Sequence, residues 1–224
     1  MFTQKKLFVT ALVLILCVWT LIHFASPASA QTKKEAPSKQ IISINPPLSS
    51  TDDPPPANAV RGGILKMIRP TFPKNVGYPP EWAPIDSIYA LPVCERLIDW
   101  DAEGNVIPWL ARSWDLDLRN NTVTFHLRKG VKFTDGTPFN AEAVRWNFQL
   151  RLDTKSQLDG DLIKSVEALD EYTVRSNCTD ITRWSPYIYG WPQNISPTAC
   201  VKNGGKEWAR FNSVGTGPFQ VVEF

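Results

Sequence analysis

The strongest structural signal in this sequence is the run PWLARSW (residues 108–114), TVTFHLRKGVKF (residues 122–133) and DGTPFNAEAV (residues 135–144). Within its middle block, Val123, Phe125 and Leu127 alternate with polar residues, which is the two-residue period of a strand with one buried face. Residues 113–118 and 122–127 flank a short polar turn. The run therefore predicts a β-hairpin.

A helix is predicted immediately after the hairpin. Asn140 is a favourable N-cap residue, so the helix should begin at Ala141. Val144, Phe148 and Leu152 then recur every four residues, which places them on one side of a helix. We expect this side to pack on the core. The Asp-Gly-Thr-Pro motif before the helix is interpreted as a structural turn.

The flanking segments alternate between strand and helix patterns. Further strands are predicted at residues 63–68, 163–169, 172–177 and 219–224, and helical segments at residues 86–98, 184–189 and 197–210. A turn is predicted at residues 101–105. The fold class is therefore α/β in the broad sense, a mixed α+β domain.

The composition excludes several functional classes. The chain has 224 residues with 24 Lys and Arg against 22 Asp and Glu, a formal charge of +2, which is too balanced for a dedicated nucleic-acid binder. It has two histidines, His23 and His126, and its four cysteines form no CxxC motif or Cys/His cluster. We expect no metal, haem or other cofactor. No nucleophile motif accompanies His126, so we expect no enzymatic activity.

The first 60 residues are expected to lie outside the folded domain. Residues 1–30 have two lysines, an apolar run over residues 7–24 and the small-residue pattern Ala28-Ser29-Ala30, which predicts a cleaved export signal. The alternative is an uncleaved membrane anchor, because the apolar run is long. Residues 31–60 contain six prolines and few apolar residues, which predicts a disordered tether. The folded part is then residues 61–224.

Three cysteines remain after removal of the signal, and export would place them in an oxidising compartment. Cys178 and Cys200 are predicted to form a disulfide. Cys94 lies in an apolar stretch and is predicted to be a buried thiol. Non-reduced mass spectrometry distinguishes these assignments.

The quoted run closely resembles the extracellular solute-binding proteins of family 5, the peptide- and nickel-binding components of ABC importers. The resemblance continues through Ser196-Pro197 and the Val-Gly-Thr-Gly-Pro-Phe block at residues 214–219, so it covers residues 61–224 in order. Arg119 departs from the pattern of the family, but it lies at the predicted tip of the hairpin. The resemblance implies a fold like the type II periplasmic binding proteins, with the first lobe only and a subdomain inserted at about residues 97–195.

The same resemblance implies the function. Members capture an oligopeptide or similar small organic solute outside the membrane, in the periplasm or at the outer face of the cytoplasmic membrane, and deliver it as monomers to ABC permease subunits. They are longer and bind between two lobes, so we expect this chain to be an N-terminal fragment that does not bind solute alone. The alternative is a cell-surface sensory or adhesion module on the same fold.

Ligand contacts are expected from loops near the cleft of this family, because loops carry most binding residues. The candidates are Tyr78, Trp82, Tyr189, Trp191 and Gln193. Trp109, Trp114 and Trp146 lie within the hairpin and helix motifs and are assigned to packing instead.

Overall fold

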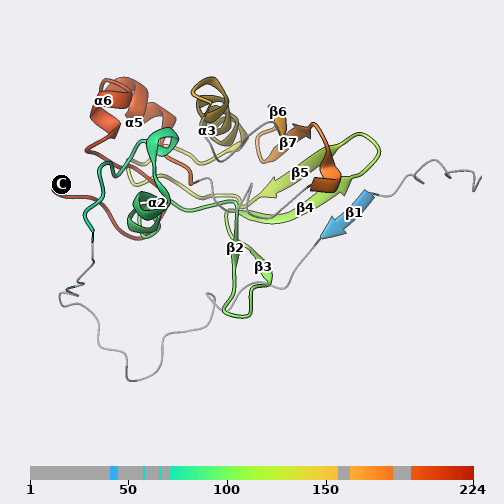
Figure 1. The fold of residues 1–224 in the computed structure, drawn as a ribbon, viewed down its shortest axis with the longest axis horizontal. Helices are drawn as coiled ribbons and strands as arrows, with labels where there is room; N and C mark the ends of the chain where they lie inside the picture. Colours follow the sequence, from blue (N-terminus) through green and yellow to red (C-terminus); the bar gives the residue numbers. More distant parts are fainter. Residues whose placement is uncertain (1–40, 45–57, 59–65, 67–70, 156–161, 184–192) are drawn as a thin grey trace, which may run out of the picture. The chain divides into compact units, whose positions relative to one another are not determined.

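The predicted hairpin forms the middle of a five-stranded antiparallel sheet (Figure 1). The computed structural model describes residues 41–44, 58, 66, 71–155, 162–183 and 193–224, all within one compact unit, Lys39–Phe224. The sheet order is β1-β4-β5-β7-β6. Its strands are β1 (Ile41–Ile44), β4 (Ala111–Asp117), β5 (Thr122–Leu127), β6 (Ile163–Asp170) and β7 (Thr173–Cys178).

The alternating burial predicted for β5 is confirmed. Val123, Phe125 and Leu127 are buried, and the polar residues between them are half-buried. At the hairpin turn, Asn121 has a φ of 54°, a left-handed conformation that asparagine tolerates better than most residues. The Asp117 carboxylate accepts the amide hydrogens of Arg119 and Asn120 and closes the turn. The unusual Arg119 therefore lies at the hairpin tip.

The predicted helix is α3 (Ala141–Asp153). Asn140 caps it as expected, because its Oδ1 accepts the Ala143 amide hydrogen at 3.0 Å. Val144 and Phe148 are buried on the side that packs against β6 and β7. A thirteen-residue helix thus covers one face of the sheet.

The buried apolar residues fall into two groups. The sheet cluster has buried members from Leu97 to Ile181, drawn from the sheet, α3 and the loops between them. The helix cluster has buried members from both sides of that range: Tyr78, Trp82, Ala90, Val93, Cys94, Ile195, Cys200 and Ala209. This division supports the boundaries near residues 97 and 195 that we propose for the inserted subdomain.

Short elements surround the helix cluster. They are the 3-10 helix η2 (Pro79–Glu81) and the helices α2 (Pro84–Ala90), α5 (Pro197–Lys202) and α6 (Lys206–Ala209). The two-stranded ribbon β2 (Ile98–Trp100) and β3 (Val106–Pro108) encloses the predicted turn, and η3 (Ile181–Arg183) follows β7. The prediction of a broken helical region over residues 197–210 is confirmed by α5 and α6.

The helix predicted over residues 86–98 is correct only to Ala90. Pro92 has no amide hydrogen and disfavours helix in the residue before it. The carbonyl groups beyond it bond to distant segments: Val93 O accepts from Gly217, Arg96 O from Leu110, and Leu97 O from Trp109. Long-range pairing thus replaces the bonds that a helix would make.

Residues 219–224 do not form the predicted strand. Gly217 N and Phe219 N donate to the carbonyl oxygens of Val93 and Pro92, and two such bonds are too few for a ladder. The strand predicted at residues 63–68 and the helix at residues 184–189 lie outside the described residues, apart from Lys66.

Four residues of the predicted tether form a strand. Residues Ile41–Ile44 form β1, which pairs antiparallel with β4 from Ile41 opposite Asp117 to Ile44 opposite Trp114. A strand edge offers unpaired amide and carbonyl groups, so even a short apolar segment can add to it. The prediction of disorder over residues 31–60 is wrong for these four residues.

The export signal and its apolar run lie outside the described residues. Across the ranges that the structure covers, none of the helices has the length and apolar character needed to cross a bilayer.

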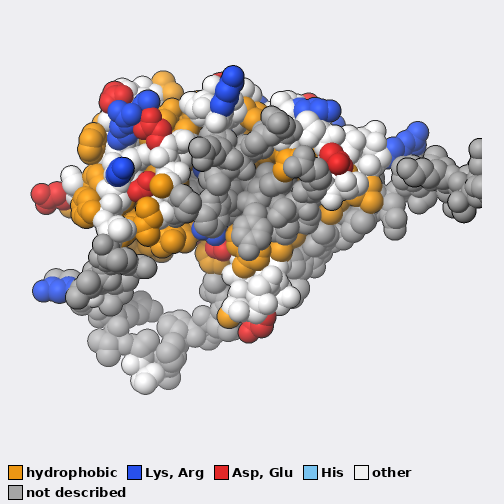
Figure 2. All heavy atoms as spheres, in the orientation of Figure 1, with side chains coloured by type: hydrophobic (Ala, Val, Ile, Leu, Met, Phe, Trp, Pro, Cys, Tyr) orange, Lys and Arg blue, Asp and Glu red, His pale blue; other side chains and the backbone are white. Residues whose placement is uncertain are grey.

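Several large apolar residues are exposed beside the helix cluster. Phe72, Phe211 and Phe224 form a surface that we call the phenylalanine face; Phe72 is 77% exposed and Phe211 55%. The rings of Phe72 and Phe224 stack with 5.2 Å between their centres. Figure 2 shows hydrophobic side chains gathered over α2 and the C-terminal segment.

Asn147 ties the two clusters together, and its replacement is the first test of this architecture. Its side-chain amide donates to Ile195 O at 2.9 Å and accepts from Ile195 N at 3.1 Å. Asn147→Ala leaves both buried backbone groups unpaired and should lower the free energy of unfolding by about 2 to 4 kcal/mol. Urea denaturation measures this change. Gln149→Ala, on the exposed side of the same helix, is the control and should change it by less than about 0.5 kcal/mol.

Candidate ligand-binding site

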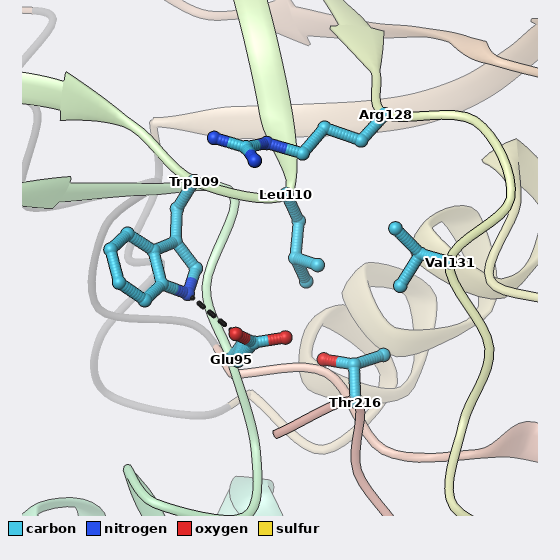
Figure 3. A pocket seen from close by; sticks show the side chains of 6 residues that line it. All are labelled: Glu95, Trp109, Leu110, Arg128, Val131 and Thr216. Carbon is cyan, nitrogen blue, oxygen red and sulfur yellow. Dashed lines mark hydrogen bonds between the residues drawn. The ribbon is translucent and has the colours of Figure 1, made fainter. Parts of the chain in front are cut away.

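A cavity of about 340 Å³ opens where segments of the two clusters meet (Figure 3). Its walls combine charged, polar and apolar side chains: Glu95, Trp109, Leu110, Arg128, Val131 and Thr216. Figure 3 shows Arg128 on one side of the cavity and Glu95 and Thr216 on the other, with Leu110 between them. This volume is within the range of sites for small molecules.

Backbone hydrogen bonds hold the walls of the cavity. Arg128 N donates to Leu110 O at 2.8 Å, and Leu110 N donates to Arg96 O at 3.1 Å. Asn194 N donates to Glu95 O at 3.0 Å. Each charged wall residue therefore lies on, or beside, a segment that is bonded to another part of the chain.

Thr216 reaches the cavity because glycine precedes it. A Cβ atom on Gly215 would lie 2.0 Å from Val93 O, so no larger residue fits without movement of the backbone. Gly217 N bonds to Val93 O, and Thr134 N bonds to Gly215 O. The Gly-Thr-Gly block thus serves close contact between backbones.

The polar groups of the cavity are incompletely paired. Trp109 Nε1 donates to Glu95 Oε1 at 3.0 Å. Arg128 Nε and Thr216 Oγ1 are buried and have no hydrogen-bond partner among the described residues. Arg128 and Glu95 both border the cavity, but no ion pair between them is found within the described residues. Unpaired buried groups of this kind mark a place that water or a ligand completes.

A second cavity, of about 380 Å³, lies on the polar face of the sheet. It is lined by side chains of β4, β5, β7 and the hairpin turn, including Asp115, Asp117 and Arg175. It lacks apolar walls, so the first cavity is the better candidate for an organic solute.

Two of the predicted ligand residues are packing residues in the structure. Tyr78 is 5% exposed and Trp82 8%, and both belong to the helix cluster. Asn75 Oδ1 accepts from Trp82 Nε1 at 2.9 Å and from Tyr78 N at 2.8 Å. The loop folds around this asparagine and turns both aromatic side chains inward, toward the helix cluster and away from the cavity, so their assignment as ligand residues stays a prediction.

Gln193 is also interior. Its Nε2 donates to Ser87 O at 2.7 Å, and its Oε1 is buried without a hydrogen-bond partner among the described residues. Tyr189 and Trp191 lie outside those residues, so their assignment stays a prediction. Of the tryptophans assigned to packing, Trp114 is 1% exposed in the core, whereas Trp109 is half-buried and also lines the cavity.

The polar walls of the cavity are not evident from the sequence. Arg128 and Thr216 lie inside blocks that were interpreted as structural, and Glu95 lies in a segment predicted to be helical. One signal was present, because Arg128 directly follows the buried strand residue Leu127. Charged residues at the ends of strands often have functional roles. Nothing in the sequence, however, indicates that Arg128 lies near Glu95 or Thr216.

The loop with Tyr78 is bound to α6 by an ionic cluster. The Glu81 carboxylate accepts from Arg210 Nε at 2.8 Å and from Nη2 at 3.0 Å, and it also pairs with Lys206. These bonds, chiefly those from Arg210, lower the pKa of Glu81 from its ordinary value of 4.5 to about 2. Its side chain is one third exposed, so solvent screens the interaction.

The second prediction concerns pH. A carboxylate whose pKa is lowered by folding stabilises the protein above its unfolded pKa, and this contribution is lost as the pH falls from about 4.5 to about 2. Glu81→Gln should therefore lower the free energy of unfolding by up to about 1 kcal/mol near neutral pH and by almost nothing near pH 2. Denaturant unfolding across this range gives the difference from the natural chain. Glu103→Gln, in an exposed turn, is the control, and a difference that grows with acid would contradict the assignment.

The predicted disulfide is absent from the structure. Cys178 ends β7 in the sheet cluster, whereas Cys200 lies in α5 in the helix cluster, and each carries a reduced thiol. The prediction for Cys94 is confirmed: it is fully buried, its Sγ lies 3.0 Å from Ser213 Oγ, and burial raises its pKa to about 12.

The third prediction follows from these thiols. Mass spectrometry of the non-reduced protein should find Cys94, Cys178 and Cys200 without a crosslink between any two of them. Because all three thiols are buried, iodoacetamide should modify them only after denaturation. A Cys178–Cys200 crosslinked peptide would overturn this expectation.

Within the described residues, no group of three or more His, Cys, Asp or Glu side chains is placed to hold a metal ion.

Comparison with known proteins gives a consistent set of relatives. The family model described as bacterial extracellular solute-binding proteins, family 5 Middle, matches residues 105–224. The nickel-binding periplasmic protein of Escherichia coli (strain K12) is 41% identical over 92 residues, which cover 40% of this chain and 18% of that protein. The glutathione-binding protein GsiB of Shigella flexneri is 38% identical over 138 residues, which cover 57% of this chain and 26% of that protein.

A solved structure agrees with these matches. The crystal structure of NikA from Brucella suis in complex with Fe(III)-EDTA superposes with a TM-score of 0.57 and 31% sequence identity, covering 69% of this chain and 32% of that chain. The fold prediction is thereby confirmed. The chain spans about one third, or less, of the length of these relatives.

Proposed function

The chain belongs to the bacterial extracellular solute-binding proteins of family 5, and from this we propose that it is the substrate-binding component of an ABC importer. In this role the protein captures an oligopeptide or a similar small organic solute outside the membrane and delivers it to the permease. The observation that carries the proposal is the family match over residues 105–224, more than half of the chain. Both sequence relatives are named for a solute that they bind and not for a reaction.

The site chemistry supports an organic solute. The cavity beside Arg128 has apolar walls and a few convergent polar groups, which is the usual composition of a small-molecule site. A peptide or amino-acid derivative offers both apolar and charged groups to such walls.

We assign tight capture to the whole protein with a second lobe, as in a cleft that closes around its ligand. Two observations support this assignment. The matched region is about one third, or less, of each relative, and the phenylalanine face exposes apolar side chains that further polypeptide would cover.

Location and partners follow from the proposed role. The predicted export signal at residues 1–30 supports a location in the periplasm or at the outer face of the cytoplasmic membrane. The partners are the ABC permease subunits, and the protein acts as a monomer.

The fourth prediction tests import directly. Deletion of the gene should abolish uptake of a labelled peptide, and the natural gene should restore it. In thermal-shift screening of the whole protein, that peptide should add about 2.7 kcal/mol of stability at one hundred times its dissociation constant. Unchanged uptake in the deletion strain would contradict import and favour the sensory or adhesion alternative.

A further inference from the structure

We propose that the cavity between the two clusters binds a zwitterionic solute of amino-acid size, with its carboxylate on Arg128 and its protonated amine on Glu95 and Thr216. The inference rests on the proposed function and deepens it, because it names the class of solute that this cavity takes from residues that all lie in the described part of the chain.

The carboxylate end is defined by Arg128. Its guanidinium borders the cavity, forms no ion pair with another described residue, and has a buried Nε without a partner. A buried donor on a charged group is costly to leave unpaired. A carboxylate is the natural complement of a guanidinium, because two oxygens match its fork of N–H groups.

The amine end is defined by Glu95 and Thr216. Trp109 Nε1 holds one carboxylate oxygen of Glu95 at 3.0 Å, and the other has no hydrogen-bond partner among the described residues. The Thr216 hydroxyl is buried and unpaired, and Figure 3 shows its oxygen directed toward Glu95. An ammonium group donates three hydrogen bonds, so it can serve both oxygens at once.

The two charged groups border the cavity without pairing with each other. Arg128 and Glu95 lie on opposite sides of it, and no ion pair joins them among the described residues. Backbone bonds from Arg128 N to Leu110 O and from Asn194 N to Glu95 O hold them in place. A molecule that carries both charges can bridge them, whereas a simple anion or cation satisfies one side alone.

The size and walls of the cavity limit the ligand. Its volume of about 340 Å³ is at the lower end of the range for small-molecule sites. Leu110 and Val131 supply apolar contact, and the Trp109 ring closes one wall. These dimensions suit a single amino acid with an apolar side chain better than an extended peptide.

The fifth prediction is tested by calorimetric titration of the whole protein with three matched probes. Leucine carries both charges, leucinamide only the amine, and N-acetyl-leucine only the carboxylate. We expect leucine to bind at least about tenfold more tightly than either analogue, because each charge-assisted contact is worth a factor of this order. Glycine and phenylalanine, tested in parallel, measure the contribution of the apolar walls.

Variants assign each end of the ligand. Arg128→Gln should remove the advantage of leucine over leucinamide, and Glu95→Gln should remove its advantage over N-acetyl-leucine. Thr216→Val should weaken leucine binding, and Thr216→Ser, which keeps the hydroxyl, should restore it. Arg145→Gln, an exposed arginine paired with Glu142 on α3, is the control and should change nothing.

The outcomes separate this inference from the proposed function. Failure of all three amino acids to bind with a dissociation constant below about 10 mM would overturn the inference and show that water fills the cavity. Equal binding of leucine and its analogues, or unchanged leucine binding by Arg128→Gln, would also overturn it. The unfolding transition of each variant shows whether it is folded. The uptake assay tests the proposed function separately, and its outcome does not depend on these results.

Discussion

The close contact between the backbone of Gly215–Gly217 and that of Pro92–Cys94 is the constraint on which the rest of this structure depends. A Cβ on either glycine would lie within 2.5 Å of a carbonyl oxygen of the other segment. The contact buries Cys94 completely and brings its Sγ to 3.0 Å from Ser213 Oγ. Because Thr134 N also bonds to Gly215 O, the same contact joins the C-terminal segment to the sheet side of the molecule.

This constraint explains why the cavity is both open and charged. Side chains can move to satisfy one another, but backbone segments that are bonded on several sides cannot. Arg128, Glu95 and Thr216 each sit on or beside such a segment, and no ion pair joins Arg128 to Glu95 among the described residues. A site held in this way is preorganised, since the protein has already met the cost of holding the charged groups apart.

The family motifs mostly serve the same structural purpose. Asp135 accepts hydrogen bonds from Thr137 Oγ1 at 2.6 Å and from Ser196 Oγ at 2.7 Å, and Ser196 also caps α5 by accepting from Ala199 N. The turn before α3 is thereby attached to the segment that returns from the sheet. Arg128, which lines the cavity, lies directly beside one of these motifs.

The hairpin, the Asn140-capped helix and the two strands after it were predictable from sequence because they are encoded locally. Alternating burial in β5 and a side chain that caps its own helix involve residues a few positions apart. The position of residues 91–98, the packing of Tyr78 and Trp82, the pairing of β1 and the separation of Cys178 from Cys200 depended on partners far away in the chain. The cavity belongs to this second group. Glu95, Arg128 and Thr216 are distant in sequence, and only the tertiary contacts between their segments bring them to one place.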